Sequence, residues 1–259
     1  NALYIPTATS KYIYRGVKKA VEDFKDKDTV AVNDVLIDGN KMLYAYGLDP
    51  LKFSMELYGR WGCYDHFDIG YKFAGGTHVF DARFQFLGST KSYNNPSDDK
   101  YFGSIGIQYS QSKYDLKDKL KINYLQDMLG YSFARKDILV PLVFSIPFGK
   151  EEQYGGFAIG GIYGHTFVDY SYLPEQSKII ENQSEIFTGL KGKQQFNSWG
   201  TFFNVKGGME YIFVTFSVAA YYQNYKSYQL INGQQFEIKG WTFVPNLGIA
   251  YYFGKGIDF

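Results

Sequence analysis

Strict alternation of apolar and polar side chains over residues 51–87 is the feature that most limits how this chain can fold. From Leu51 to Trp61 the odd positions are apolar or small, and the even positions include Lys52, Glu56 and Arg60. Residues 67–73 and 80–86 repeat the pattern after short breaks. Because successive side chains leave a strand on opposite faces, a period of two predicts strands. We expect three antiparallel strands with one aromatic, apolar face and one charged face.

Two architectures can use such strands. In a soluble sandwich the charged face is solvated and the apolar face packs in the core. In a transmembrane β-barrel the apolar face contacts lipid and the charged face lines the lumen. The alternation by itself fits both architectures, so the choice depends on the rest of the chain.

Composition favours the barrel. Aromatic residues make up 20% of the 259 residues, with 25 Tyr and 23 Phe, which suits two aromatic girdles around a membrane-spanning wall. No apolar run approaches the roughly 20 residues that a membrane helix needs, so a membrane crossing would have to use strands. The net charge of +1 gives no overall field that would attract nucleic acid.

The remainder of the chain supplies further alternating segments and predicts a single all-β domain over residues 1–259. A change of phase predicts a bulge near Leu125, and Pro141 and Pro147 predict an irregular strand. We predict an antiparallel transmembrane β-barrel of about twelve strands, or ten if the first two lie outside the wall; residues 1–50 can lie partly outside it. Besides the three strong strands, nine further strands are expected, and residues 41–47 are expected to extend a hairpin. The nine are 10–17, 29–37, 101–110, 120–133, 138–148, 154–170, 198–211, 213–225 and 241–253.

The lengths of the connections support this prediction. With twelve strands, the longer connections all fall at one end of the barrel, and the short turns at 74–77 and 211–213 fall at the other. Short periplasmic turns and long extracellular loops are typical of outer-membrane barrels. The short breaks at 62–65 and 134–137 and the longer one at 111–119 depart from this rule. The longer connections are 18–29, 88–100, 171–197 and 226–240.

Both ends of the chain resemble known barrels. The segment from Leu247 to Phe253, followed by the terminal Phe259, resembles the closing strand of bacterial outer-membrane barrels, although Gly254-Lys255-Gly256 interrupts its apolar face. Residues 12–16 look like the first strand of several small outer-membrane barrels of unassigned role. The resemblance implies a bacterial outer-membrane location and an assembly route, with the lipid bilayer as partner, and it implies no substrate.

The sequence gives little support for an enzyme. Barrel phospholipases and lipid A deacylases use a His-x-Ser-Asn motif, and none of the three histidines stands in one. Omptin-type proteases use Asp-His, and Asp65-His66 is such a pair, but no second acidic pair accompanies it. Cys63 is the only cysteine, so neither a disulfide nor a zinc motif is expected. We expect no catalytic residue, no metal and no cofactor.

The charged face of the three strong strands is the candidate functional feature. We predict that these residues line the lumen of a narrow passive channel for small polar solutes. The competing interpretation is that the charges pair with one another and fill the lumen of a structural barrel, which docks or scaffolds another envelope protein. A role of 171–197 in adhesion or phage binding is a third hypothesis. The predicted lining residues are Lys52, Glu56, Arg60, Asp68, Lys72, Asp81 and Arg83.

Overall fold

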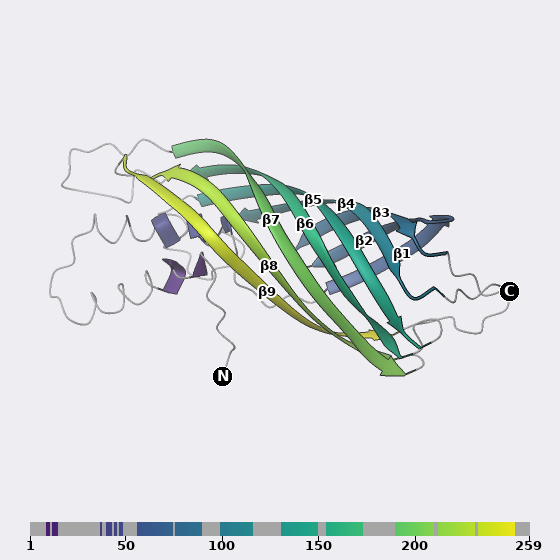
Figure 1. The fold of residues 1–259 in the computed structure, drawn as a ribbon. Coiled ribbons are helices and arrows are strands. Elements are labelled where there is room, and N and C mark those ends of the chain that lie inside the picture. Colours follow the sequence, from purple (N-terminus) through teal and green to yellow (C-terminus); the bar gives the residue numbers. More distant parts are fainter. Residues whose placement is uncertain are drawn as a thin grey trace, which may run out of the picture.

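The computed structural model forms one antiparallel sheet of nine strands in the described residues (Figure 1). Each strand pairs with the next one along the chain, in the order β1 to β9. The strands are β1 Glu56–Tyr64, β2 Phe67–Ala74, β3 Thr77–Leu87, β4 Phe102–Asp115, β5 Tyr131–Phe148, β6 Gly155–Tyr172, β7 Leu190–Met209, β8 Ile212–Gln229 and β9 Gln235–Tyr251. The structure describes residues 9–10, 12–14, 37, 40–42, 44–45, 47–48, 56–74, 76–89, 99–115, 131–149, 154–172, 190–209, 212–230 and 233–251.

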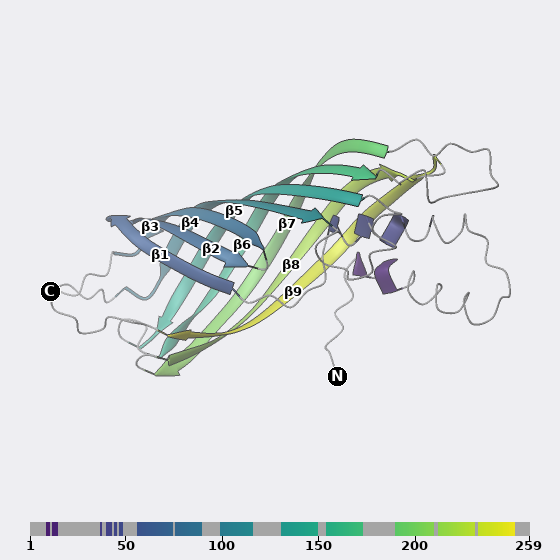
Figure 2. The same ribbon diagram turned by 180° about the vertical axis from the view of Figure 1, so that it is seen from behind.

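The sheet curls into a trough whose two margins are β1 and β9 (Figures 1 and 2). Within the described residues, β1 pairs only with β2 and β9 only with β8. We call the end with the β7–β8 connection the lower end, and the end with the β8–β9 connection the upper end. The concave side of the trough is the inward face and the convex side is the outward face.

The prediction of an all-β antiparallel fold is confirmed, but the number of strands differs. The described residues hold nine strands rather than twelve or ten. The predicted strand 10–17 and the predicted hairpin extension 41–47 are helical wherever they are described, and so is Ile37 at the end of the predicted strand 29–37. The bulge predicted near Leu125 lies outside the described residues.

The second difference is in β5, which runs without a turn through the break predicted at 134–137. Odd residues are apolar in the first part of this strand, as at Tyr131 and Phe133, and even residues are apolar from Ile138 onward. The apolar side chains therefore change from the inward to the outward face within one strand. In the sequence, this exchange resembles the end of one strand and the start of another.

The loss of this turn also changes the arrangement of the connections. The strand ends joined by 88–101 lie at the lower end together with those joined by 210–211. The strand ends joined by 75–76 lie at the upper end with those joined by 173–189 and 230–234. The prediction that all the longer connections share one end was therefore wrong, because removing one turn reverses the direction of every later strand relative to the earlier ones.

Pro141 interrupts the ladder in β5, as expected of a residue without an amide hydrogen. The pairing of β4 with β5 skips from Ile105↔Leu142 to Gln108↔Leu139, and the register on both sides of the gap is the same. A Cβ at Gly106 would lie 3.4 Å from Cγ of Pro141, so this glycine leaves room for the proline ring. The irregularity is local and does not shift the register.

The lower part of the outward face is apolar on all nine strands, and we call it the apolar band. None of its positions in the described residues is Asp, Glu, Lys or Arg. A row of aromatic residues in register, Tyr163, Trp199, Tyr222 and Trp241, marks its upper limit on β6–β9. The band consists of alternate residues of 57–61, 67–73, 80–86, 105–109, 138–148, 157–163, 199–209, 212–222 and 241–249.

Above the aromatic row the two faces exchange character. The outward positions on β5–β9 become mostly polar, and the inward positions become apolar and buried. Helical residues of the N-terminal part of the chain, Tyr44, Ala45 and Leu48, pack on these inward positions and are completely buried (Figure 1). The inward residues of this upper core are Tyr131, Phe133, Val168, Phe196, Tyr225, Tyr228, Phe236 and Ile238.

Candidate functional site: the charged inward face

Arg60 is the centre of an ion-pair cluster on the inward face of β1–β3. Its guanidinium contacts Asp68 on β2 at 2.5 Å and also pairs with Asp81 on β3. The guanidinium Nε donates a hydrogen bond to the Tyr58 hydroxyl. The carboxylate of Asp81 is buried, and it fits because Gly70 stands opposite: a Cβ at Gly70 would collide with Oδ1 of Asp81.

Arg83 lies beside this cluster and has a different role. Its backbone is paired with Asp68 in the β2–β3 register, yet both Asp68 and Asp81 are engaged by Arg60. Nε of Arg83 is buried and has no hydrogen-bond partner among the described residues. Two arginines and two aspartates balance in formal charge, but in the described residues the ion pairs of both carboxylates are with Arg60, and Nε of Arg83 has no partner.

The other predicted lining residues are only partly described. Lys52 lies outside the described residues. Glu56 begins β1 opposite Ala74, and Lys72 lies opposite Tyr58, so the register gives both positions the same face as Arg60. The structure thus brings Arg60, Asp68, Asp81 and Arg83 together, and their role as a lumen lining remains a prediction.

A second charged cluster lies higher on the inward face, where β5 passes under the N-terminal helical residues. The guanidinium of Arg135 pairs with both carboxylate oxygens of Asp137, at 2.8 and 2.9 Å from Nε. Asp137 also accepts hydrogen bonds from the hydroxyls of Thr166, at 2.6 Å, and Ser110, at 3.2 Å. Arg135 in turn donates to the carbonyl oxygen of Leu48 at 2.5 Å, and this contact ties the helical residues to the sheet.

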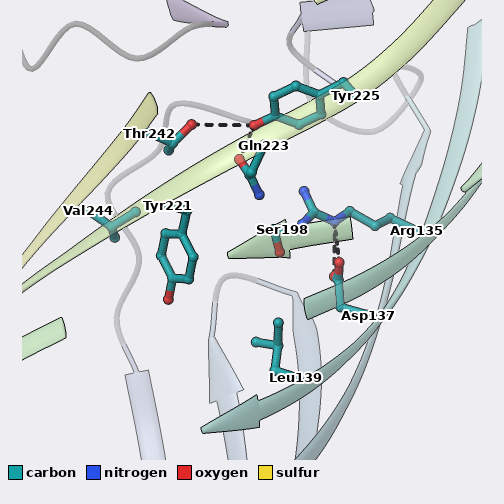
Figure 3. A pocket seen from close by; sticks show the side chains of 9 residues that line it. All are labelled: Arg135, Asp137, Leu139, Ser198, Tyr221, Gln223, Tyr225, Thr242 and Val244. Carbon is teal, nitrogen blue, oxygen red and sulfur yellow. Dashed lines mark hydrogen bonds and ion pairs between the residues drawn. The ribbon is translucent and has the colours of Figure 1, made fainter. Parts of the chain in front are cut away.

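Below this cluster is a chamber of about 200 Å³ whose lining comes from β5, β7, β8 and β9 (Figure 3). The Tyr225 hydroxyl donates to Oε1 of Gln223 and lies 3.4 Å from the Thr242 hydroxyl. Gln223 and Ser198 point into the space between the strands (Figure 3). The chamber therefore combines one internally neutralised ion pair with uncharged hydrogen-bonding groups, an environment suited to a small polar molecule.

The upper core contains a cluster of tyrosines around Tyr44. The ring of Tyr44 lies 4.9 Å from Tyr228, 5.3 Å from Tyr170 and 6.4 Å from Tyr131, and its hydroxyl donates to the Gln229 carbonyl at 3.0 Å. Burial raises the pKa of the Tyr131 and Tyr228 phenols above the ordinary value. Both rings therefore stay neutral, as packing in an apolar core requires.

At the level of the apolar band, aromatic rings lie flat against the inward face. A Cβ at Gly160 would stand 2.5 Å from the Phe202 ring, and a Cβ at Gly200 would stand 2.7 Å from the Tyr221 ring. Each ring thus occupies the space above a glycine on the adjacent strand. This arrangement keeps large side chains close to the wall rather than across the interior.

The Arg135–Asp137 cluster is not among the predicted site residues, because the sequence predicts a turn at 134–137. A signal was present: Phe133, Arg135, Asp137 and Leu139 continue the odd phase that Tyr131 begins. Three charged residues in a row, Arg135, Lys136 and Asp137, conceal that phase. The outward member of this run, Lys136, is polar because it lies above the apolar band.

The three histidines lie on separate elements, in the β1–β2 turn, on β3 and on β6. His66 lies in the β1–β2 turn with φ 64°, and its buried Nδ1 has no hydrogen-bond partner in the described part of the chain. His78 contacts the Tyr71 hydroxyl through Nδ1 at 2.8 Å, and His165 contacts the Asn197 side-chain oxygen at 2.5 Å. Among the residues that the structure describes, no three His, Cys, Asp or Glu side chains gather in a way that could hold a metal ion.

Comparisons with protein-family models, with curated proteins and with solved structures give no match. Over the described part of the chain, no helix has the length and apolar character to cross a membrane.

Proposed function

We propose that this chain is a bacterial outer-membrane β-barrel that acts as a narrow channel for small polar solutes. The observation that carries the proposal is the segregation of charge along the strands. At the level of the apolar band, the described acidic and basic residues, among them Arg60, Asp81 and Arg83, occupy inward positions. Lipid on the outside and water on the inside is the environment that favours this distribution.

The dimensions of the band support a membrane location. A strand of about 9–11 residues crosses a bilayer when tilted, and the outward apolar stretches on β5, β7 and β8 have this length. The aromatic row at the upper limit has the place expected of residues at a membrane–water interface. The strands continue above this row, where their outward side chains become polar and their inward side chains form the upper core.

A membrane location requires the sheet to close. Unpaired backbone groups at a sheet edge are too costly in hydrocarbon, so the margins at β1 and β9 must be satisfied by each other or by additional strands. We propose that closure produces a barrel whose interior contains the two charged clusters. The resemblance of residues 247–253 to a closing strand agrees with this arrangement.

The side chains of the interior suggest how the passage of solutes through such a channel is limited. Glycines and flat rings leave space at the level of the band, while Tyr44, Ala45 and Leu48 cover the upper end. We propose that solutes pass the Arg60–Asp81 cluster and the chamber below Arg135, and that movement of the helical residues controls access from above. The channel is therefore expected to open rarely.

The second candidate is a structural barrel that docks another envelope protein. The helical residues that fill the upper end favour it, because a permanently closed barrel would need such a core. The two candidates differ in one measurable property, which is whether ions pass through the barrel.

Single-channel recording in a planar bilayer separates these candidates. The channel hypothesis predicts discrete conductance steps, and Arg83→Gln should increase the preference for cations because it removes an inward cation whose Nε has no partner among the described residues. Lys239→Gln is the matched control, since Lys239 is on the outward face. If the inserted wild-type protein stays silent at all voltages, and Tyr44→Ala does not open it, the docking candidate replaces the channel.

A further inference from the structure

The outward surface of β5–β7 above the aromatic row carries lysine side chains, which the described apolar band does not contain. Lys136, Phe167 and Gln195 lie side by side across the three strands. One step further up, Lys193 lies opposite Asp169, which is opposite Ala134. Lys136 thus lies beside the exposed Phe167, and Lys193 lies one row further up, on the polar part of the outward face.

These residues line a hollow on the surface. The hollow has a volume of about 660 Å³ and is bordered by Lys136, Phe167, Asp169, Lys193, Gln194 and Gln195. A second hollow of about 390 Å³ adjoins it and includes Lys191. The two share Asp169 and Lys193, so together they form a continuous concave strip across β6 and β7.

The strip carries an excess of positive charge. Lys136, Lys191 and Lys193 oppose a single acidic residue, Asp169, which leaves three minus one, or two, positive charges. The ion pair between Lys193 and Asp169 spans 4.0 Å, and its side chains are 86% and 59% exposed. Such an exposed pair is weak, so Lys193 can turn toward another anion at little cost.

Surface suited to acyl chains begins one row below the strip. That intervening row has His165 opposite Asn197. Below it, the rings of Tyr163 and Trp199 are tilted against each other with centroids 4.5 Å apart, at the upper limit of the apolar band. Phe167 is outward and exposed, and its ring centroid lies 4.6 Å from that of His165. A ligand that matches the whole surface needs an anionic group above and an apolar part below.

We propose that this strip binds the phosphate-bearing headgroup of an anionic lipid, with Lys136 and Lys193 contacting the phosphate and Phe167 contacting the start of the acyl chains. The proposal rests on the membrane location proposed above. Ammonium groups bind phosphate as point charges through charge-assisted hydrogen bonds. A lysine near an anionic lipid surface contributes roughly fivefold in affinity, so the two together should contribute roughly 25-fold.

The test uses the full chain in a neutral detergent, titrated with a short-chain phosphatidic acid and, separately, with phosphatidylcholine of the same chain length. Native mass spectrometry counts the bound lipids. We expect phosphatidic acid to bind at least tenfold more tightly than phosphatidylcholine. The double variant Lys136→Gln/Lys193→Gln should lose that preference, while Lys239→Gln should keep it, because Lys239 is outward on β9 and pairs with Glu237 at 3.4 Å.

Equal affinity for the two lipids, or an unchanged preference in the double variant, would overturn the proposal. Inorganic phosphate at the same concentration is the third probe: if it displaces phosphatidic acid completely, the strip is a site for free anions and not for a lipid. Insertion into phosphatidylcholine vesicles is measured in parallel. A protein that inserts but shows no lipid preference refutes only this inference, whereas a protein that does not insert refutes the membrane location as well.

Discussion

Replacing Tyr44 by alanine should release the N-terminal helical residues from the sheet without unfolding the sheet itself. Tyr44 is completely buried, its ring contacts three other tyrosines, and its hydroxyl donates to the Gln229 carbonyl. Truncation of a buried aromatic side chain to alanine typically costs about 3–5 kcal/mol. At 1.4 kcal/mol per factor of ten, the ratio of docked to released protein should fall by roughly two to four orders of magnitude.

Amide hydrogen exchange in detergent micelles measures this release directly. Protection over residues 40–48 should fall in Tyr44→Ala, while protection of β6 and β7 in the apolar band stays at the wild-type level. Tyr14→Ala is the matched control, because Tyr14 belongs to the same N-terminal part of the chain and is exposed. Unchanged protection over 40–48 would refute the docked arrangement, and equal loss across β5–β9 would refute the view that the sheet is stable without it.

Two further predictions concern the pH dependence of docking and the packing of the sheet. Burial raises the pKa of Tyr131 and Tyr228, so the docked state holds protons that the released state gives up. Docking should therefore be complete below the ordinary tyrosine pKa of about 10 and weaken as the pH rises above it. Limited proteolysis of residues 40–48 between pH 8 and 11.5 would reveal this change, and a flat profile would contradict it. In the second prediction, Gly160→Ala would place a Cβ 2.2 Å from the Leu142 carbonyl oxygen, and such overpacking costs about 1–3 kcal/mol. Urea unfolding in detergent should show this loss of stability, while Gly207→Ala, whose Cβ meets nothing within 4 Å, should show none.

The strands with uniform alternation could be predicted from the sequence with little error. Residues 67–73 and 80–86 correspond to β2 and β3, because their apolar side chains stay on one face from end to end. Arg60, Asp68 and Asp81 were placed on a common face for the same reason. In these strands the alternation identifies both the strand itself and the side chains that share each of its faces.

The strands β5–β9 were harder to predict because each passes through two environments. In the apolar band the outward side chains are apolar, and above it the inward ones are, so the phase of the pattern reverses within one strand. The polar residues at the reversal, such as Arg135 and Asp137, resemble a turn. The start of β7 from Leu190 was assigned to a loop for the same reason.

The helical residues of the N-terminal part could not be recognised from alternation. Tyr44, Ala45 and Leu48 form a short pattern that fits either a strand or a helix, and the choice depends on the concave surface formed by residues nearly a hundred or more positions later. Packing against this distant surface determines whether the segment is helical or extended, and the local sequence pattern does not specify that surface.

The central claim, that the outward face contacts lipid, can be tested through tryptophan fluorescence. All three tryptophans of the chain, Trp61, Trp199 and Trp241, are outward and 70%, 63% and 54% exposed. In vesicles of lipids brominated along the acyl chain, the account predicts strong quenching of the emission and little effect of the aqueous quencher acrylamide. Strong quenching by acrylamide together with no effect of the brominated lipids would contradict it, because the outward face would then be in contact with water.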